Sequence, residues 1–503
     1  MNAGPTDSRA VAPADVDSES LSKGPSESPF GEDRAPDRRW AMAVLAAALA
    51  LGLLRFVRLG QWSLWLDEVF TWGDAHAAAG RANALGYLLI RWTVEALGGD
   101  PTETALRLAP AVVGYLAIPL TYWAFVPIGG RLRAATAALV VAVSAWEIQW
   151  SQTARFYTMV QALGLVGGGL AIRGMLGQRS IVTLLGMGAA ASGYFFHLQG
   201  ALMAGAIGAA AWLFPPVQSA DAKRSVRRLC TGLALLGLAA TPLVWSVFRK
   251  YLAQKGVDDP LAGVAHFALT TGFFVTPTVA ALALGAWLVA LRSGSVAPSF
   301  IGAVAVIGGV ALACLAAFAK VSAQYVFGLF PWIAMLAAWP VGAETGGGGS
   351  SKAISLRRLS WLLVLVLPLL AQTAVYFTVG NGQRAKWREA VELVAAQRGS
   401  TDVVVGAPAP VVEFYLTGGR ETDVRSHDAV VQLDRYNPRP YRALVQEGRT
   451  AWFIVRNEYN FSMSKADRVA FEQFLSESCR MVKHFPVAVE ARDLSVTVWR
   501  YDP

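Results

Sequence analysis

The chain has 503 residues, of which 54% are hydrophobic and only 16% are charged, whereas a soluble protein usually carries about 25% charged residues. This composition excludes an ordinary soluble protein and predicts an integral membrane protein with some soluble part. The formal net charge of +9 does not indicate nucleic-acid binding, because the basic residues lie mostly in short loops between apolar runs, where they report membrane orientation.

The N-terminal residues 1–36 are rich in Pro, Ser, Gly and acidic residues, so we expect a disordered leader. Candidate membrane spans follow, since a span needs roughly 17–25 apolar residues. The apolar runs lie near 40–57, 106–126, 134–150, 158–174, 180–197, 200–214, 229–247, 267–290, 299–318, 322–340 and 359–379. We therefore expect a mainly α-helical, polytopic transmembrane bundle of about eleven spans within residues 37–379.

The charges of the connecting loops predict the orientation of the bundle. Basic loops alternate with less basic ones along the chain, and the positive-inside rule places the basic loops in the cytoplasm. They lie at 37–39, 131–133, 173–179, 222–228 and 351–358. With an odd number of spans, residues 60–105 and 380–503 then lie outside. We expect a multi-pass protein of the cell (inner) membrane with a cytoplasmic N-terminus.

The composition changes after residue 380, where short segments with strand and helix patterns appear. Three segments have the pattern of strands: 402–407, 451–456 and 494–501. Two have the pattern of amphipathic helices: 385–397 and 465–477. We expect a small extracytoplasmic α/β domain over 380–503, and no catalytic constellation is legible in it.

Motifs for metal or cofactor binding are absent from the sequence. The three cysteines, Cys230, Cys314 and Cys479, do not form a pair with metal-ligand spacing, and two lie in or beside apolar runs. There is no HExxH, Walker or GxSxG motif. We expect no disulfide framework, no bound metal and no cofactor.

Two adjacent acids, Asp67 and Glu68, follow the first apolar run in the segment "SLWLDEVFTWGDAH". The connection 60–105 that contains them is long for a link between two helices. Residues 83–99 have the pattern of a helix lying in the membrane interface, and Asp100 to Glu103 resemble a helix start. The acids therefore belong to a structured layer on the outer face of the membrane.

The spacing of the two acids limits their chemistry. Glycosidase carboxylates face each other across a bond at about 5–9 Å, whereas neighbouring residues of a helix or strand point in different directions. One base with a supporting acid suits a transferase whose leaving group is a phosphate, which also needs cations. The alternative is that Asp67 and Glu68 begin a helix or form a loop salt bridge.

Ionisable side chains on the same side of the membrane supply candidate cations. Arg155, His197 and Lys320 follow the ends of predicted spans, and ionisable groups near a membrane usually line a cavity or pathway. The alternatives are interfacial anchors for Arg155 and Lys320, as for Arg58 after the first span, and a hydrogen-bonded core residue for His197. Glu147 is either cavity-facing or interfacial.

Six motifs in one order resemble the C-type superfamily of membrane glycosyltransferases, particularly the protein O-mannosyltransferase and lipid A aminoarabinose transferase group. The similarity covers about residues 40–500. The motifs are "LRFVRLGQWSLWLDE" (54–68), "ALRLAPAVVGYLAIPLTYW" (105–123), "SQTARFYTM" (151–159), "FFHLQG" (195–200), "VSAQYVFGLFPWIAML" (321–336) and "KWREAVELVAA" (386–396).

The resemblance implies roles for individual residues. Asp67 is implied as the catalytic base, with Glu68 as its neighbour in the site. The implied donor-phosphate ligands are Arg155, Tyr157 and Lys320, and the further substrate-contact candidates are His197, Asn83, Tyr87, Arg58 and Gln324. Three departures from the family pattern are Gln324 for Arg, Thr153 for Glu, and Asn83-Ala84-Leu85 for His-Pro-Pro.

The implied activity is inverting transfer of a sugar from a polyprenyl-phosphate-linked donor to a hydroxyl of a glycan, lipid or protein on the extracytoplasmic face. The expected partners are that donor, the acceptor and membrane lipids, without nucleic acid. The alternative is a lipid-linked sugar flippase or transporter, which predicts broken helices and charges at mid-membrane. A third hypothesis is a purely structural membrane protein, which the adjacent acids Asp67 and Glu68 disfavour.

Overall fold

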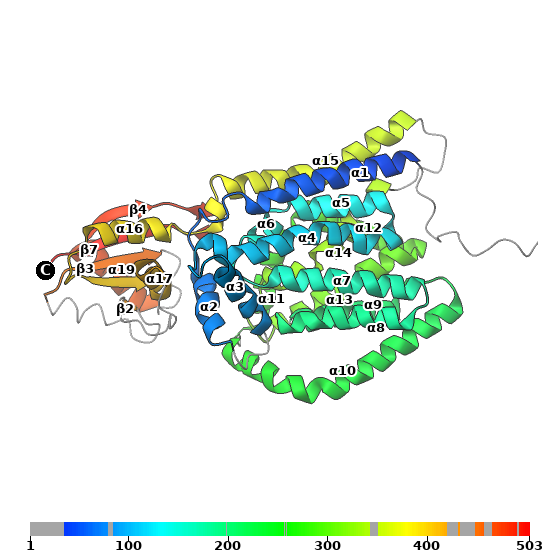
Figure 1. The fold of residues 1–503 in the computed structure, drawn as a ribbon, viewed down its shortest axis with the longest axis horizontal. Coiled ribbons are helices and arrows are strands. Elements are labelled where there is room, and N and C mark those ends of the chain that lie inside the picture. The colour runs from blue at the N-terminus through cyan, green and yellow to red at the C-terminus, as the bar shows by residue number, and fades with distance from the viewer. Residues whose placement is uncertain are drawn as a thin grey trace, which may run out of the picture.

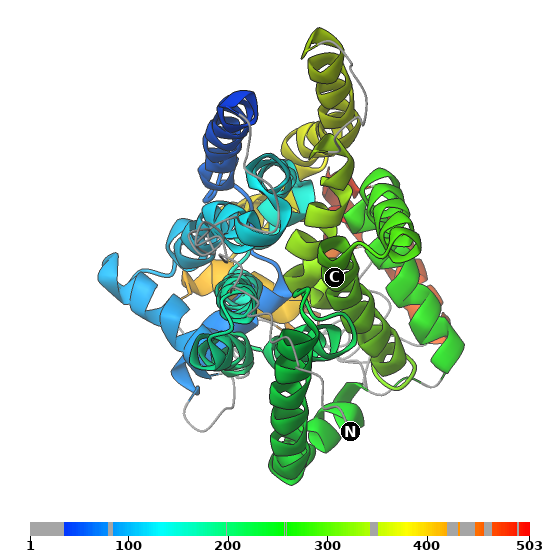
Figure 2. The same cartoon turned by 90° about the vertical axis from the view of Figure 1, so that its right-hand side faces the viewer.

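The computed structural model describes residues 35–78, 84–197, 199–255, 257, 259–342, 351–419, 431–432, 448–456, 465–489 and 492–503. A long helical bundle carries a smaller α/β domain at one end, and the start of α1 lies at the other end (Figure 1). Figure 2 looks along the bundle, so that most of its helices are seen close to end-on.

The bundle helices follow the predicted apolar runs in order. Their bounds are α1 (Ala35–Gly52), η2 (Leu53–Phe56), α4 (Glu103–Gly129), α5 (Arg131–Val143), α6 (Ala145–Ser151), α7 (Tyr157–Leu176), α8 (Ser180–Ser192), η3 (Gly193–Phe195), α9 (Gln199–Leu213), α10 (Ala220–Lys255), α11 (Pro260–Val275), α12 (Pro277–Ser293), α13 (Val296–Ala316), η4 (Ala323–Leu329), α14 (Phe330–Ala337), η5 (Trp339–Gly342), α15 (Ser351–Phe377) and η6 (Asn381–Gln383).

Within the described residues, six helices are long and apolar enough to cross a membrane, or up to eight if each of two bent helix pairs counts as one span. The predicted number of about eleven therefore stays a prediction. The runs 180–197 and 200–214 form helices shorter than a full span. The run 267–290 is not one straight helix, which corrects the sequence prediction. Thr276, at φ 67°, separates α11 from α12, and the two axes differ by 96°.

Helix α5 lies at the centre of the helical core. Eleven of its thirteen residues are buried, between Leu132 and Val143, and a helix that is apolar all round must be surrounded by other helices. Its neighbours include α1, α4 and α14. Close packing elsewhere uses glycine: a Cβ on Gly167 would lie 2.6 Å from the carbonyl oxygen of Gly186, so α7 and α8 approach backbone to backbone.

Two helices form a layer between the bundle and the domain (Figure 1). They are α2 (Leu66–His76) and α3 (Ala84–Ala96), so the described parts of the connection, 60–78 and 84–105, are structured as predicted. The predicted helix start at Asp100 lies too early. Thr102 is the N-cap of α4, because its backbone is extended and its hydroxyl accepts the N–H of Ala105.

The C-terminal domain contains a five-stranded sheet in the order β2-β1-β3-β7-β4. Strand β1 pairs in parallel with β2 and β3, whereas β7 pairs antiparallel with β3 and β4. The strands are β1 (Val403–Ala407), β2 (Val431–Gln432), β3 (Ala451–Arg456), β4 (Arg480–Phe485) and β7 (Val496–Tyr501), and β5 (Ala488–Val489) pairs with β6 (Arg492–Asp493).

Helices cover both faces of this sheet. Along β3, Trp452 and Ile454 belong to one apolar cluster with residues of α16 (Trp387–Gln397) and α17 (Ala409–Thr417). Phe453 and Val455 belong to the other, with α19 (Lys465–Ser478). The three predicted strands and two predicted helices are present. The sequence analysis did not predict α17, a short apolar run, or β4, which is exposed on most of both faces.

Candidate active site

The first turn of α2 carries both acids, and their side chains differ in burial. Trp65 is the N-cap, and its backbone N–H donates to Oε2 of Glu68 at 3.1 Å. Glu68 is fully buried, whereas Asp67 is half-buried. The predicted divergence of adjacent acids is therefore seen on one helical turn.

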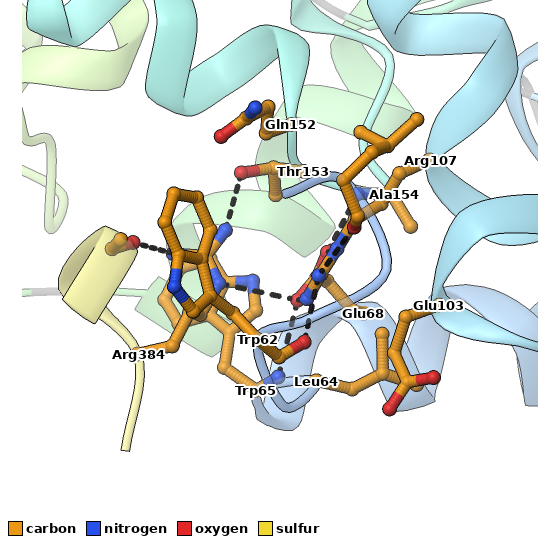
Figure 3. A network of polar contacts seen from close by, with 12 residues as sticks. Trp62, Leu64, Trp65, Glu68, Glu103, Arg107, Gln152, Thr153, Ala154 and Arg384 are labelled. Atoms are coloured by element: carbon orange, nitrogen blue, oxygen red, sulfur yellow. Dashed lines mark hydrogen bonds and ion pairs between the residues drawn. The ribbon is translucent and has the colours of Figure 1, made fainter. Parts of the chain in front are cut away.

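Glu68 accepts hydrogen bonds from three sides (Figure 3). Arg107 donates to both carboxylate oxygens at 2.8 Å, and the N–H of Ala154 donates to Oε1 at 2.8 Å. Nε of Arg384 lies 3.4 Å from Oε2. Burial opposes ionisation of Glu68, but the two arginines outweigh it and hold the pKa of this carboxyl below its usual range. Glu68 is thus an ionised, fully occupied acceptor with a structural role.

The two arginines join Glu68 to the surrounding backbone, and we call Glu68, Arg107, Arg384 and Ala154 the Glu68 cluster. Arg107 also donates to the carbonyls of Leu59, Trp62 and Ser63. Arg384 donates to Oγ1 of Thr153 at 2.5 Å, and its guanidinium lies 5.3 Å from the Trp65 ring. Segments from α2, α4, the 152–154 turn and the residues after α15 therefore meet at one carboxylate.

The carboxylate of Asp67 makes no hydrogen bond or ion pair with any residue that the structure describes. Arg155 lies beside it and donates to Oγ1 of Thr71 at 3.1 Å and to the backbone carbonyl of Asp67 at 3.5 Å. Burial disfavours the charge of Arg155, but the Asp67 carboxylate, together with Tyr157 and Tyr87, outweighs burial and raises the pKa of the guanidinium. Asp67 therefore keeps its lone pairs available next to a fixed cation.

A row of aromatic rings extends from this pair into the bundle. The ring centroids of Trp150 and Tyr157 are 4.6 Å apart, those of Tyr157 and His197 are 5.3 Å apart, and those of His197 and Tyr325 are 5.3 Å apart. Nδ1 of His197 accepts the N–H of Gln199 at 3.3 Å. The structure thus brings together the predicted Arg155, Tyr157 and His197.

The remaining predicted site residues lie elsewhere or make other contacts. Lys320 is exposed, and no described contact joins it to Asp67 or Arg155. Oε1 of Gln324 accepts the Ser322 hydroxyl at 2.5 Å. Arg58 is exposed and donates to the carbonyl of Phe377. Tyr87, on α3, is the exception: its ring lies 5.1 Å from that of Phe156, and it is one of the groups that raise the pKa of Arg155. Asn83 lies outside the described residues.

Three residues of this region were missed by the sequence analysis: Arg107, Arg384 and Thr71. An arginine inside the apolar run 106–126 was a usable signal for Arg107, because a charge in a span is rarely without a partner. Nothing in the polar segment after α15 singles out Arg384. In the described part of the chain, no group of three His, Cys, Asp or Glu side chains could hold a metal ion.

No protein-family model and no curated protein sequence matches the chain. Solved structures do match it. ArnT from Cupriavidus metallidurans in the apo state is 13% identical, with a TM-score of 0.50, over 93% of this chain and 98% of that one. AglB, an archaeal oligosaccharyltransferase from Archaeoglobus fulgidus, is 10% identical, with a TM-score of 0.54, over 90% of this chain and 74% of that one.

These solved structures belong to the C-type superfamily of membrane glycosyltransferases. The chain has their fold over more than nine-tenths of its length in the first case, so the resemblance predicted from the motifs is confirmed for the fold. At 10–13% identity the likeness shows the fold alone, and the reaction must be argued from the site.

Proposed function

We propose that the chain is an inverting glycosyltransferase that moves a sugar from a polyprenyl-phosphate-linked donor to a hydroxyl acceptor on the outer face of the membrane. The observation that carries the proposal is the half-buried Asp67 carboxylate, which makes no described hydrogen bond and lies beside the Arg155 cation. A base for the acceptor and a cation for the leaving phosphate thus lie side by side. AglB, which has this fold, is solved in complex with an inhibitory peptide and a dolichol-phosphate.

The reaction uses one base and no strong acid. The acceptor oxygen attacks the anomeric carbon while its proton passes to the Asp67 carboxylate. The bond between the anomeric carbon and the phosphate oxygen breaks, and the electron pair leaves with the phosphate. Arg155 and Tyr157 stabilise the charge that develops on it. Attack on the face opposite the phosphate inverts the configuration at that carbon.

Glu68 and its cluster position this chemistry without contacting the substrate. Glu68 fixes the N-terminus of α2 through the N–H of Trp65 and fixes the 151–155 turn through the N–H of Ala154. Asp67 and Arg155 are direct neighbours of these two anchored points. One buried carboxylate therefore sets the separation of the base and the cation.

The orientation and domain boundaries form part of the same proposal. Residues 37–379 make up the transmembrane catalytic domain, with the catalytic layer 60–105 and the α/β domain 380–503 both on the extracytoplasmic side of the cell membrane. The basic loops carry this assignment.

A lipid-linked sugar flippase is the second candidate, because two observations favour it. The pair α11–α12 is a broken segment with a 96° bend, and Arg55 with Glu147 places charge inside the bundle. Both features are expected of transporters. Transport, however, does not require a carboxylate to accept a proton from a hydroxyl, so the two functions differ in their need for Asp67.

The deciding variant is Asp67→Asn, which keeps the size of the side chain but cannot accept a proton. It should lower turnover about 10²–10⁴-fold in purified enzyme with a polyprenyl-phosphate sugar, and should fail to restore the glycan profile of a deletion strain. Asp100→Asn, at an exposed acid of the same layer, is the control and should restore both. Normal turnover by Asp67→Asn would exclude the base and favour the flippase.

A further inference from the structure

The segment that carries Gln324 and Tyr325 has an unusual backbone. It is η4, a 3-10 helix of seven residues between α13 and α14. Runs of 3-10 helix longer than three or four residues are uncommon, because their hydrogen bonds have poorer geometry than those of an α-helix. The position of the Tyr325 ring beside His197 therefore depends on contacts from outside η4.

Two buried glutamine side chains, from two different helices, supply these contacts. Gln161 of α7 donates from Nε2 to the carbonyl of Phe327 at 3.0 Å, and Gln199 of α9 donates from Nε2 to the carbonyl of Tyr325. Gln161 is fully buried and Gln199 is 4% exposed. The Phe327 carbonyl also accepts the backbone N–H of Phe330, and the two glutamine amides add side-chain hydrogen bonds to two carbonyls of η4 within three residues. We call Gln161 and Gln199 the glutamine clamp.

Gln161 is itself oriented by a buried ion pair. Its Nε2 donates to Oε1 of Glu147 at 2.6 Å, and Oε2 of Glu147 lies 3.9 Å from Nη2 of Arg55. Arg55 donates to the carbonyls of Val141 and Ala142. Glu147 is fully buried, so it lies inside the bundle rather than at the membrane interface, which the sequence left open.

Gln199 acts on both sides of one ring contact. Its side chain holds the Tyr325 carbonyl, while its backbone N–H donates to Nδ1 of His197. The His197 and Tyr325 rings, 5.3 Å apart, are therefore set by the same residue. The Tyr157 ring, which is coupled electrostatically to Arg155, completes the row.

We propose that Gln161 and Gln199 are positioning residues that clamp η4, so that Tyr325 and His197 stay in place beside Tyr157 and Arg155 and bind the phosphate of the polyprenyl donor. The inference rests on the proposed function, since it assigns the donor phosphate to the side chains around Tyr325 and His197. Neither glutamine touches the reacting atoms. Loss of either glutamine should weaken binding of the lipid phosphate and leave binding of the acceptor unaffected.

The test is a titration of the full-length, detergent-solubilised protein with undecaprenyl phosphate, read by tryptophan fluorescence. Gln161→Leu and Gln199→Leu should each weaken binding about tenfold, the effect of about 1.4 kcal/mol. In turnover assays the donor KM should rise, with the acceptor KM unchanged. Thr373→Val is the matched control, because it removes a buried hydrogen bond to the carbonyl of Val143 in the same bundle and touches neither η4 nor its clamp.

A charge exchange separates positioning from stability. Gln161→Glu alone places two carboxylates together and should lower the melting temperature. Adding Glu147→Gln returns the region near Arg55 to one carboxylate and one amide and should recover the melting temperature. The carboxylate that Gln161→Glu introduces cannot donate to the Phe327 carbonyl, so the affinity for undecaprenyl phosphate should stay low.

Three results would overturn the clamp: affinities of both leucine variants within twofold of the parent protein, an equal loss in Thr373→Val, or recovery of affinity in the exchanged pair. Asp67→Asn distinguishes the two proposals, because it should abolish turnover and still bind the lipid. If Asp67→Asn turns over normally while the clamp variants lose affinity, Asp67 is not the catalytic base, and the role of the glutamine clamp is supported.

Discussion

Arg107 holds Glu68 at two points: Nε donates to Oε1 and Nη2 donates to Oε2, both at 2.8 Å, and neither side chain is exposed. This two-point contact is the preferred geometry of an arginine–carboxylate pair. It leaves Glu68 without a role in proton transfer. Of the two adjacent acids, one is therefore fixed by the fold and the other remains available for chemistry.

Removal of Arg107 should destabilise the fold strongly, because it takes away the two-point partner of a fully buried charge and leaves only Arg384 near it. Arg107→Met should cost about 3–5 kcal/mol of unfolding free energy and lower the melting temperature sharply. Arg91→Met provides the control, since Arg91 and Glu95 form an exposed pair on α3 worth about 0.3–0.5 kcal/mol. Equal shifts in the two variants would contradict the assignment.

The same carboxylate predicts a pH dependence of stability. The folded-state pKa of Glu68 is lowered, so the unfolded chain binds the proton first as the pH falls. The stabilisation by ionised Glu68 is complete above the ordinary glutamate pKa of about 4.3 and is lost as the pH falls below it, towards the folded-state pKa. The melting-temperature gap between the parent protein and Glu68→Gln should be wide at pH 7 and narrow on acidification. A gap independent of pH would exclude the ionised state.

The predictable part of the fold followed from patterns with a direct physical cause. Apolar run lengths placed the bundle helices, and short segments rich in β-branched and aromatic residues placed β1, β3 and β7. The break at Thr276 was missed because the run 267–290 was judged by hydropathy alone, whereas Pro277 disfavours a helical backbone at the residue before it. Strand β4 was missed because no buried face imposes alternation on it.

The part of the site that was predictable is the part that follows from residue type and from the side of the membrane on which each residue was expected. Asp67, Arg155, Tyr157 and His197 lie together, as their positions after predicted spans suggested. The Glu68 cluster was not predictable, because its members are up to 316 residues apart in sequence and the pairing depends on tertiary packing. Sidedness alone grouped Lys320 with Arg155; Lys320 is exposed and makes no described contact with Arg155, so its role as a phosphate ligand stays a prediction.

Arg155 and Lys320 should therefore behave differently. Arg155→Ala removes a partly buried cation beside Asp67 and should lower kcat/KM for a polyprenyl-phosphate sugar about 10–100-fold, the effect of a hydrogen bond to a charged group. Lys320→Ala should stay within about twofold. The reverse order of the two variants would move the phosphate to Lys320 and away from the aromatic row.

Tyr415 joins the C-terminal domain to the catalytic layer. Its hydroxyl accepts the N–H of Leu64 at 2.6 Å and donates to Oε1 of Glu103 at 2.9 Å. Tyr415→Phe should cost about 1–3 kcal/mol and make the domain more sensitive to limited proteolysis, with slower turnover. Tyr501→Phe, on β7 within the domain, should leave proteolysis at the junction unchanged. An intact junction in Tyr415→Phe would show that the contact is dispensable.

Membrane sidedness decides whether the whole arrangement faces the right substrates. Basic residues around Arg224 and Arg227 should face the cytoplasm, which places Ser400 and the Asp67 layer outside. In a background with the three native cysteines replaced, Ser400→Cys should react with an impermeant maleimide in cells whose outer barrier is open. Ser225→Cys, in the basic segment at the start of α10, should react only after the membrane is permeabilised. Labelling in the opposite order would place Asp67 on the cytoplasmic face, where a polyprenyl-linked donor presented from outside could not reach it, and the proposed reaction would have to be abandoned.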